Sequence, residues 1–443
     1  MKKVRVIIFS SALHDGVSVM GARSGLAEGL RKRTELEIIY PTMLPSLPSS
    51  LGRYIDGVSQ SRTLPNPDGD VLTVCFIATG GTEEIFRSYL SSLPRPVVLL
   101  SDGFHNSFAA SLEISTYLEQ QGVERYVFNA PLDYDDEFFD SFVSALQNIC
   151  CGAEVQGHPA SASGGGEALP AFSRQHLKAL EKTRIGLVGG ASSWLISSDI
   201  DREYISKTYG ATFVDVEIDE LEKFYGMSGL SNPDVGRLVS QMSRYLSPER
   251  SEEDLVDAVR MYMALRKIVV KYNLNALTIK CFGILESCST TSCLALAMLN
   301  DEGVVSACEG DIPALWTMLY ARQVLGKPSF MANPSSSNSA ELTIDFAHCT
   351  IPLSMVHGYR LPSHFESRIG IGVAGSVPSG RYRILKFSGE RLDRFYSAEG
   401  EIIMNTNVPQ RCRTQVRFKF GRSEDFDRFL SESKGNHIIM VAL

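Results

Sequence analysis

The sequence has no C-x-x-C pair, although it contains nine cysteines. An odd number of cysteines without paired spacing argues against a disulfide framework and against a zinc-thiolate site, so we expect reduced thiols. Cys75, Cys281 and Cys308 lie inside apolar runs, where cysteine behaves as a small buried hydrophobic residue. The cysteines therefore indicate no redox or metal chemistry of their own.

Long apolar runs and excess positive charge are also missing. No run is long enough to cross a membrane, and Arg5 interrupts the short apolar stretch after Met1, so a signal peptide is not expected. The formal net charge is −8, and the attraction that drives nucleic-acid binding is absent. We predict a cytoplasmic protein with no membrane and no nucleic-acid partner.

The sequence gives little support to phosphate binding or to catalysis by a serine nucleophile. Gly189-Gly190 does not form the dinucleotide fingerprint, and neither a G-x-x-x-x-G-K-[ST] loop nor a G-x-S-x-G elbow is present. The segment at 78–83, Ala-Thr-Gly-Gly-Thr-Glu, fits two interpretations. It is an anion-binding loop, or a tight turn that needs glycine.

The first two thirds of the chain alternate strand and helix patterns. Strand candidates at 5–10, 72–77, 96–100 and 125–128 alternate with helix candidates at 21–33 and 109–121. Such alternation predicts a parallel sheet flanked by helices. A Gly/Ser/Pro-rich stretch at 151–171 indicates a linker, after which a helix at 173–182 and a strand at 184–190 open a second α/β domain.

Beyond His348 the pattern changes to that of half-buried strands. Residues 380–388 and 414–420 alternate polar and apolar side chains, and only one late helix is expected, near 425–430. The predicted fold is α/β, with two Rossmann-like α/β domains followed by a β-rich, antiparallel barrel-like domain. The predicted domain boundaries are 1–170, 171–346 and 347–443.

Carboxylates follow two apparent neighbouring strands. The run at 276–284 leads to Glu286, and the run at 304–308 leads to Glu309 and Asp311. Because the carboxyl ends of parallel strands meet at one sheet edge, these groups would repel one another without a cation between them. A hard divalent cation meets that need, although Asp311 just before Pro313 also fits an ordinary helix cap.

Six short segments occur together in one order. They are Ser107–Glu113, Ala307–Pro313, Phe346–Pro352, His364–Glu366, Cys412–Gln415 and Gly435–His437. As a set they resemble the L-fucose isomerase and L-arabinose isomerase superfamily, especially its shorter fucose-isomerase-like branch. The resemblance implies a metal-dependent aldose–ketose isomerase that acts on a monosaccharide. The implied cofactor is Mn²⁺, with Mg²⁺ or Co²⁺ as alternatives.

The resemblance also assigns roles to residues. It implies Glu286 and His437 as metal ligands, with Asp311 as the second acid in the fucose branch and Glu309 in the arabinose branch. Glu286 and Asp311 would also be catalytic, because carboxyl groups can move the proton through an ene-diol(ate) intermediate. The implied substrate-binding residues are His348, His364, Glu366, Arg413 and Trp194. His348 is in addition a loose match to a further histidine ligand.

The resemblance leaves the sugar open among fucose, arabinose and acidic sugars such as sulfoquinovose, whose anionic group Arg413 or Arg360 would accept. It implies a homo-oligomer, a trimer or hexamer, in which His105 and Asn106 reach a neighbouring site. Two rival functions share the scaffold. One is a non-catalytic sugar sensor, and the other is an epimerase or aldolase that uses the same enediolate.

Overall fold

A computed structural model of the chain describes residues 3–11, 19, 21, 23–40, 58–60, 71–153, 155, 178–229, 232–432 and 434–443. The chain divides into two compact units. Unit 1 takes residues 1–165, 334–344 and 422–436, and unit 2 takes 166–333, 345–421 and 437–443. The three predicted domains stay a prediction, since the division into units follows different boundaries.

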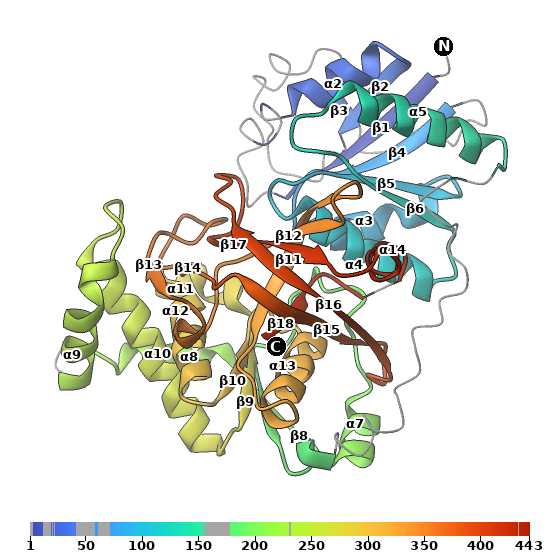
Figure 1. The fold of residues 1–443 in the computed structure, drawn as a ribbon. Helices are drawn as coiled ribbons and strands as arrows, with labels where there is room; N and C mark the ends of the chain where they lie inside the picture. The colour runs from blue at the N-terminus through green and yellow to red at the C-terminus, as the bar shows by residue number, and fades with distance from the viewer. Residues whose placement is uncertain are drawn as a thin grey trace. The chain divides into compact units, whose positions relative to one another are not determined.

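Unit 1 contains a six-stranded, fully parallel sheet with the order β3-β2-β1-β4-β5-β6 (Figure 1). Its strands are β1 Lys3–Phe9, β2 Glu35–Tyr40, β3 Val58–Gln60, β4 Val71–Ile77, β5 Val97–Ser101 and β6 Arg125–Asn129. Its helices are α2 Ser24–Arg31, α3 Glu83–Tyr89, α4 Ser107–Gln120, α5 Asp136–Cys150 and α14 Ser423–Ser431. The predicted parallel α/β arrangement is confirmed here.

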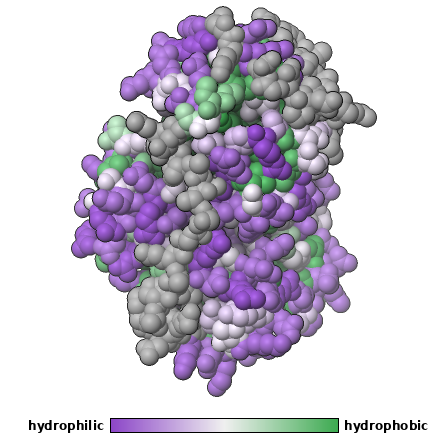
Figure 2. Space-filling view, turned by 90° about the vertical axis from the view of Figure 1, so that its right-hand side faces the viewer, coloured by the Kyte–Doolittle hydropathy of each residue, from purple (hydrophilic) through white to green (hydrophobic). Residues whose placement is uncertain are grey.

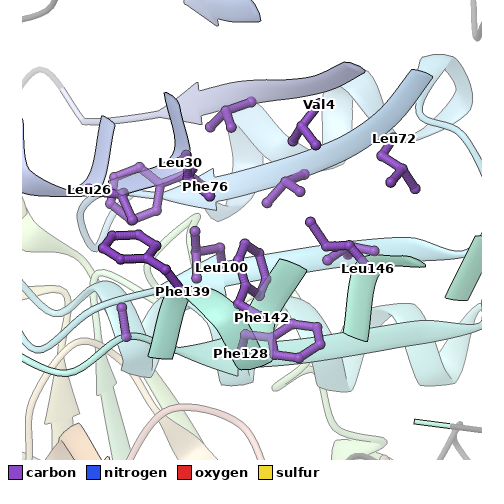
Figure 3. Packing of buried hydrophobic residues seen from close by; sticks show 14 of the residues in the cluster. Val4, Leu26, Leu30, Leu72, Phe76, Leu100, Phe128, Phe139, Phe142 and Leu146 are labelled. Carbon is purple, nitrogen blue, oxygen red and sulfur yellow. The ribbon is translucent and has the colours of Figure 1, made fainter. Parts of the chain in front are cut away.

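The core of unit 1 lies between the sheet and the helix pair α2 and α5. Phe128 of β6 meets Phe142 of α5 edge to face, with ring centroids 4.9 Å apart, and Leu26 and Leu30 of α2 join the same cluster (Figure 3). A Cβ atom at Gly29 would lie 2.0 Å from the Phe139 ring, so only glycine lets α2 approach α5. Successive residues of a strand face opposite sides, and Phe9 of β1 accordingly packs on Phe86 of α3 instead.

Unit 2 contains a four-stranded parallel sheet and most of a closed barrel. The sheet has the order β10-β9-β7-β8, with β7 Arg184–Val188, β8 Thr212–Val216, β9 Ala276–Ile279 and β10 Val305–Ala307. Its helices are α7 Arg202–Tyr209, α8 Ile218–Gly226, α9 Pro233–Met242, α10 Glu252–Tyr272, α11 Leu285–Cys288, α12 Cys293–Asp301 and α13 Ile312–Gln323. Helix α10 begins with a capping box in which the side chains of Ser251 and Asp254 bond reciprocally to each other's backbone amides.

Six strands close the barrel in the order β11-β12-β17-β16-β15-β18. They are β11 Phe330–Asn338, β12 Thr343–His348, β15 Gly380–Ser388, β16 Arg394–Asn405, β17 Thr414–Phe420 and β18 Ile438–Ala442, and a separate pair is formed by β13 Gly358–Arg360 and β14 Ala374–Ser376. The predicted C-terminal barrel is confirmed, and it takes in β11 and nearly all of β12, which precede residue 347. Residues 334–344, which comprise the second half of β11, the turn and the start of β12, belong to unit 1.

Helix α13 joins the sheet and the barrel within unit 2. It packs against β9 and β10 on the sheet side and against β15 and β18 on the barrel side. Its residues 312–321 are all buried, which explains why its sequence is apolar on every face. The N-terminus of α13 is therefore held where the sheet edge meets the barrel.

Some predicted boundaries were wrong. The strand predicted at 276–284 ends at Ile279, because a 3-10 turn at Cys281–Ile284 follows, in which Gly283 N donates to Lys280 O at 2.9 Å. The helix predicted at 21–33 is shorter, Ser24–Arg31. Of the predicted helix at 173–182, residues 178–180 form a 3-10 turn and 173–177 lie outside the described residues, as does most of the predicted linker at 151–171.

The face drawn in Figure 2 is mostly hydrophilic among the described residues, with smaller hydrophobic areas between. This is the usual distribution when most large apolar side chains are inside. Among the helices that the structure describes, none combines the length and apolar character needed to cross a membrane.

Candidate metal centre

The carboxyl edge of the unit 2 sheet is where an α/β sheet of this order binds ligands. The chain passes from β7 to β8 on one side and returns to the other side of β7 for β9, so the edge after β7 and β9 is a topological switch point. The loops after β7, β9 and β10 carry Trp194, Phe282 and Glu309. The candidate site lies at this edge.

The backbone at Glu309 is held in an unusual conformation. Its φ is 63°, in the left-handed region that costs a non-glycine residue energy, and Gly310 follows with φ 74°. A Cβ atom at residue 310 would lie 2.4 Å from Gly190 O, so the loops after β7 and β10 touch there and require glycine. Ser192 N donates to Glu309 O at 3.0 Å, and Trp194 Nε1 donates to Glu309 Oε2 at 2.7 Å.

Two buried histidines from the barrel lie beside this carboxylate. His348 ends β12 and His437 directly precedes β18. His437 Nε2 lies 3.5 Å and His348 Nε2 lies 3.9 Å from Glu309 Oε1, and one ligand atom from each of the three residues lies within 4.8 Å of the others. We call Glu309, His348 and His437 the metal group.

One atom of the metal group is an exception to ordinary hydrogen bonding. His437 is fully buried, and its Nε2 has no hydrogen-bond partner among the described residues. Leaving a buried polar nitrogen unsatisfied costs about 1–3 kcal/mol. An atom of this kind, next to a carboxylate, is expected where a ligand completes the site.

Asp311 contacts the metal group through the Nδ1 side of the His437 ring. Its Oδ1 accepts from Ala314 N at 2.7 Å, which makes it the N-cap of α13. Its Oδ2 lies 2.9 Å from His437 Nδ1 and 3.5 Å from Lys386 Nζ. Both carboxylate oxygens are therefore engaged, and the one toward His437 keeps the proton of that ring on Nδ1.

The charges of the centre depend on one another. Burial raises the pKa of Glu309, but His437 and His348 outweigh it and bring the pKa down to about 2. Burial also raises the pKa of Asp311, yet Lys386 and His437 hold that pKa below its usual range. Without a cation the two carboxylates are thus ionised at neutral pH.

The two histidines differ in charge. Burial and the nearby His437 lower the pKa of His348 to about 3, so its ring is neutral at pH 7. Burial lowers the pKa of His437, but Glu309 and Asp311 outweigh this effect and raise the pKa to about 9. The proton on His437 is the positive charge that offsets the carboxylates, and a bound divalent cation would replace it.

Glu286 is the predicted residue that the structure does not bring to this place. Because β9 ends at Ile279, Glu286 falls in the short helix α11, where its side chain is exposed, and it is not part of the metal group. Glu309, His437 and His348 come together, with Asp311 adjacent. The assignment of Glu286 as a ligand and catalytic acid stays a prediction that the geometry does not favour.

Lys386 was missed from the sequence. Its side chain is 1% exposed, and it lies on the same face of β15 as buried Tyr382 and Ile384. A lysine on the apolar face of an alternating strand is the signal that could have identified it, since a charge there needs a buried partner.

Aromatic rings connect the metal group to the other predicted substrate-binding residues. Trp194, bonded to Glu309, packs edge to face on Phe282 at 5.0 Å between ring centroids, and Phe282 packs on the ring of His364 at 5.7 Å. His364 Nε2 lies 3.9 Å from Glu366 Oε2. Trp194, His364 and Glu366 are therefore linked to Glu309 by a continuous series of contacts. Phe282, which is part of this series, had not been predicted.

The donor set of the metal group fits a divalent transition-metal cation. Ligand atoms about 2.1 Å from a cation lie about 3.0–3.5 Å apart in an octahedron or tetrahedron. The distances of 3.5 and 3.9 Å to Glu309 Oε1 need only small side-chain shifts to match. Two imidazoles and one carboxylate form a mixed nitrogen and oxygen donor set, which suits a transition-metal cation better than Mg²⁺.

Comparison with known proteins points to sugar isomerases. No protein-family model matches the chain. A sulfoquinovose isomerase of Clostridium sp. (strain MSTE9) is 29% identical over 209 residues, 42% of this chain and 46% of the relative. The chain is similar to sulfoquinovose isomerases.

Two further sulfoquinovose isomerases support this likeness. The protein of Alkalicoccus urumqiensis is 24% identical over 240 residues, 49% of this chain and 53% of the relative. That of Priestia aryabhattai is 22% identical over 257 residues, 52% of this chain and 56% of the relative. The chain thus spans about half the length of the curated relatives it matches.

Proposed function

We propose that this chain is a metal-dependent aldose–ketose isomerase of the L-fucose and L-arabinose isomerase type. The observation that carries the proposal is the convergence of buried His437 and His348 on ionised Glu309, with one ligand atom of each within 4.8 Å of the others. The name shared by the relatives supports sugar isomerisation as the reaction. The predicted trimer or hexamer remains a prediction.

The metal would be held by Glu309, His348 and His437. When bound, a divalent cation polarises the sugar oxygens and stabilises the negative charge that develops during enolisation. We propose Mn²⁺, the cofactor that the resemblance implies, with Co²⁺ as the alternative, and the two imidazole donors disfavour Mg²⁺. The Asp311 carboxylate keeps the His437 proton on Nδ1, so that Nε2 offers its lone pair, and Lys386 offsets the charge of Asp311.

Isomerisation also needs a group that moves a proton between adjacent carbons. We assign this role to Glu366, whose side chain is 11% exposed and lies beside His364, the ring that packs on Phe282. Burial lowers the pKa of His364, so its neutral ring can share a proton with the carboxyl group. Both oxygens of Asp311 are already engaged, Oδ1 by Ala314 N and Oδ2 by His437 Nδ1, and exposed Glu286 is the rival candidate.

The metal dependence is tested with metal-stripped protein. The protein is supplied in turn with Mn²⁺, Co²⁺ or Mg²⁺ and screened against a panel of aldoses for ketose formation. We expect ketose with Mn²⁺, and loss of both bound metal and turnover in His437→Ala. His357→Ala is the matched control, because His357 is exposed and lies outside the metal group.

The products separate the rival functions. An inverted stereocentre would show an epimerase, shorter products an aldolase, and sugar binding without turnover in the presence of Mn²⁺ a sensor. For the proton carrier, Glu366→Gln and Glu286→Gln are compared for ²H incorporation from solvent at saturating Mn²⁺. Exchange that survives in Glu366→Gln and is lost in Glu286→Gln would return the role to Glu286.

A further inference from the structure

Lys386 is a buried cation on the barrel side of the metal group. Its side chain is 1% exposed. Strands β15 and β18 pair antiparallel with Leu385 opposite Ile439, which places Lys386 beside the start of β18, and His437 directly precedes that strand. Lys386 Nζ lies 3.5 Å from Asp311 Oδ2, the same oxygen that lies 2.9 Å from His437 Nδ1. Lys386 therefore meets the metal group through one shared carboxylate oxygen.

The ammonium group of Lys386 is held less closely than other cations of the protein. Among the residues that the structure describes, Asp311 is its one hydrogen-bond or ion-pair partner. Buried Lys434, by contrast, donates to three backbone carbonyl oxygens at distances between 2.7 and 2.9 Å. Arg413, predicted from the sequence to bind substrate, donates to both oxygens of Ser363 at 2.6 and 2.9 Å. A single contact at 3.5 Å does not offset the desolvation of a buried ammonium group, so stability alone does not explain this lysine.

Asp311 does not depend on Lys386 for its hydrogen bonds. Its Oδ1 accepts from Ala314 N at 2.7 Å, and its Oδ2 has the His437 ring at 2.9 Å. The N-terminus of α13, which Asp311 caps, adds partial positive charge of its own. The carboxylate is thus satisfied without a lysine, and what Lys386 adds is a full positive charge.

The added charge changes the balance of the centre once a cation binds. Glu309 and Asp311 are both ionised, so their two negative charges equal the charge of one divalent cation. Lys386 then leaves the filled centre with one positive charge in excess. Enolisation develops one negative charge on the sugar, and a positive centre stabilises that charge. The same excess repels the entering cation, because burial limits screening between the two positive charges.

We propose that Lys386 is a positioning residue whose charge, acting across Asp311, weakens metal binding and in return strengthens the stabilisation of the negative charge that develops on the sugar. This inference rests on the proposed isomerase function and adds a residue to it. Its signature is a pair of effects with opposite signs. Removing the charge should tighten the binding of Mn²⁺ and slow turnover at saturating Mn²⁺.

A purely structural role for Lys386 predicts a different result. If the lysine only orients Asp311, and Asp311 in turn orients His437, its removal loosens the ligand ring. Mn²⁺ binding would then weaken, in the same direction as expected for Asp311→Asn. The sign of the change in Mn²⁺ affinity therefore separates an electrostatic role from an orienting one.

The test compares three substitutions at this position. Lys386→Met removes the charge and keeps an unbranched side chain, Lys386→Gln removes the charge but keeps a donor toward Asp311, and Lys386→Arg keeps the charge. Mn²⁺ binding to metal-stripped protein is measured by calorimetry, and kcat is measured at saturating Mn²⁺ with the aldose that the wild type converts fastest. In the Met and Gln variants we expect both the Kd for Mn²⁺ and kcat to fall on the order of 10-fold, the effect of unit charges about 10 Å apart at an effective dielectric constant of about 20. Lys386→Arg should stay within about threefold of wild type in both values, because the charge is kept.

Lys419→Met is the matched control, since it removes an exposed lysine from β17 of the same barrel and should change neither value. A higher Kd in the Met and Gln variants would make Lys386 a structural support, and an unchanged Kd or kcat would likewise overturn the proposal. Wild-type behaviour of Lys386→Gln alone would assign the effect to the hydrogen bond and not to the charge. If the wild type binds Mn²⁺ but isomerises no sugar, the isomerase proposal fails, whereas tighter Mn²⁺ binding by the Met and Gln variants still supports the action of the Lys386 charge on the centre.

Discussion

The two parallel sheets both gather charged groups at their carboxyl edges, but with different outcomes. In unit 1, Arg23 is fully buried, donates to both oxygens of Asp102 at 2.5 and 2.8 Å, and also donates to the carbonyl oxygens of Ala78 and Val19. Asp102 accepts in addition from Tyr134 Oη at 2.7 Å and from Phe104 N at 3.0 Å. Every group in this network has partners within the protein.

At the corresponding edge of the unit 2 sheet, the hydrogen bonding of the buried groups is incomplete. His437 Nε2 has no hydrogen-bond partner among the described residues, and its nearness to Glu309 is electrostatic, at 3.5 Å. Buried charges with complete hydrogen bonding rigidify a fold, whereas a buried donor set with an open position is suited to a ligand. The edge in unit 1 is therefore a complete structural charge network, whereas the edge in unit 2 is a candidate binding site.

Glu309→Gln gives the largest expected effect. Replacing a carboxylate ligand by an amide should lower kcat/KM on the order of 10³-fold and abolish stoichiometric Mn²⁺ binding, measured by metal analysis after dialysis. The free energy of unfolding of the metal-free protein should change less than in Asp102→Asn. If the Glu309 variant were the less stable of the two, Glu309 would belong to a structural network and the comparison would fail.

Asp102→Asn should act on stability instead. It leaves the buried Arg23 charge without its carboxylate, which is expected to cost about 3–5 kcal/mol of unfolding free energy, measured by urea denaturation. Asp140→Asn is the control, because Asp140 pairs with Arg33 in the same unit while its side chain is 71% exposed, and no resolvable change is expected. Native Mn²⁺ affinity in the folded fraction of the Asp102 variant would support the separation of roles.

Asp311→Asn should have an intermediate effect on metal binding. Loss of the carboxylate that accepts from His437 Nδ1 is expected to weaken Mn²⁺ binding about 10- to 100-fold. Activity should recover in part at saturating Mn²⁺, because the three ligand side chains remain. Activity that stays absent at metal saturation would show that Asp311 acts directly on the substrate, as the sequence analysis proposed.

The smallest expected effect concerns the ion pairs that Asp345 forms with Arg411 and Arg417 in the barrel. Burial raises the pKa of Asp345, but Arg417 and Arg411 outweigh it and hold the pKa below 3.8. The carboxylate therefore contributes stability that is present above pH 3.8 and is lost as the pH falls through its folded pKa. Unfolding free energies should decline between pH 5 and pH 3 more steeply in wild type than in Asp345→Asn, and parallel slopes would contradict this role.

Much of the fold could be predicted from the sequence, because the patterns that indicate each strand and helix lie within short segments of the chain. The apolar run at 72–77 and the alternating residues at 380–388 and 414–420 gave the parallel strands and the barrel strands correctly. The end of β9 was wrong, because Cys281 and Ile284 continue the apolar pattern although the backbone has already turned. Apolar periodicity cannot distinguish a buried strand from a buried 3-10 turn.

The site was predicted less completely than the fold. Acidic strand ends indicated Glu309 and Asp311, but their different tasks depend on His437, which is distant in sequence and comes next to them only through the barrel. The contact of Lys386 with Asp311 likewise joins segments that no local pattern connects. Residue types could be predicted, whereas the choice between ligand and supporting residue required the geometry.

The place of β18 has a consequence for how the protein is made. This strand lies between β11 and β15 and completes the barrel, and His437 directly precedes it. During synthesis on the ribosome, Glu309 and His348 emerge before His437, so the three candidate ligands cannot come together until the last strand has been translated. Closure of the barrel and assembly of the candidate centre therefore both depend on the same final segment.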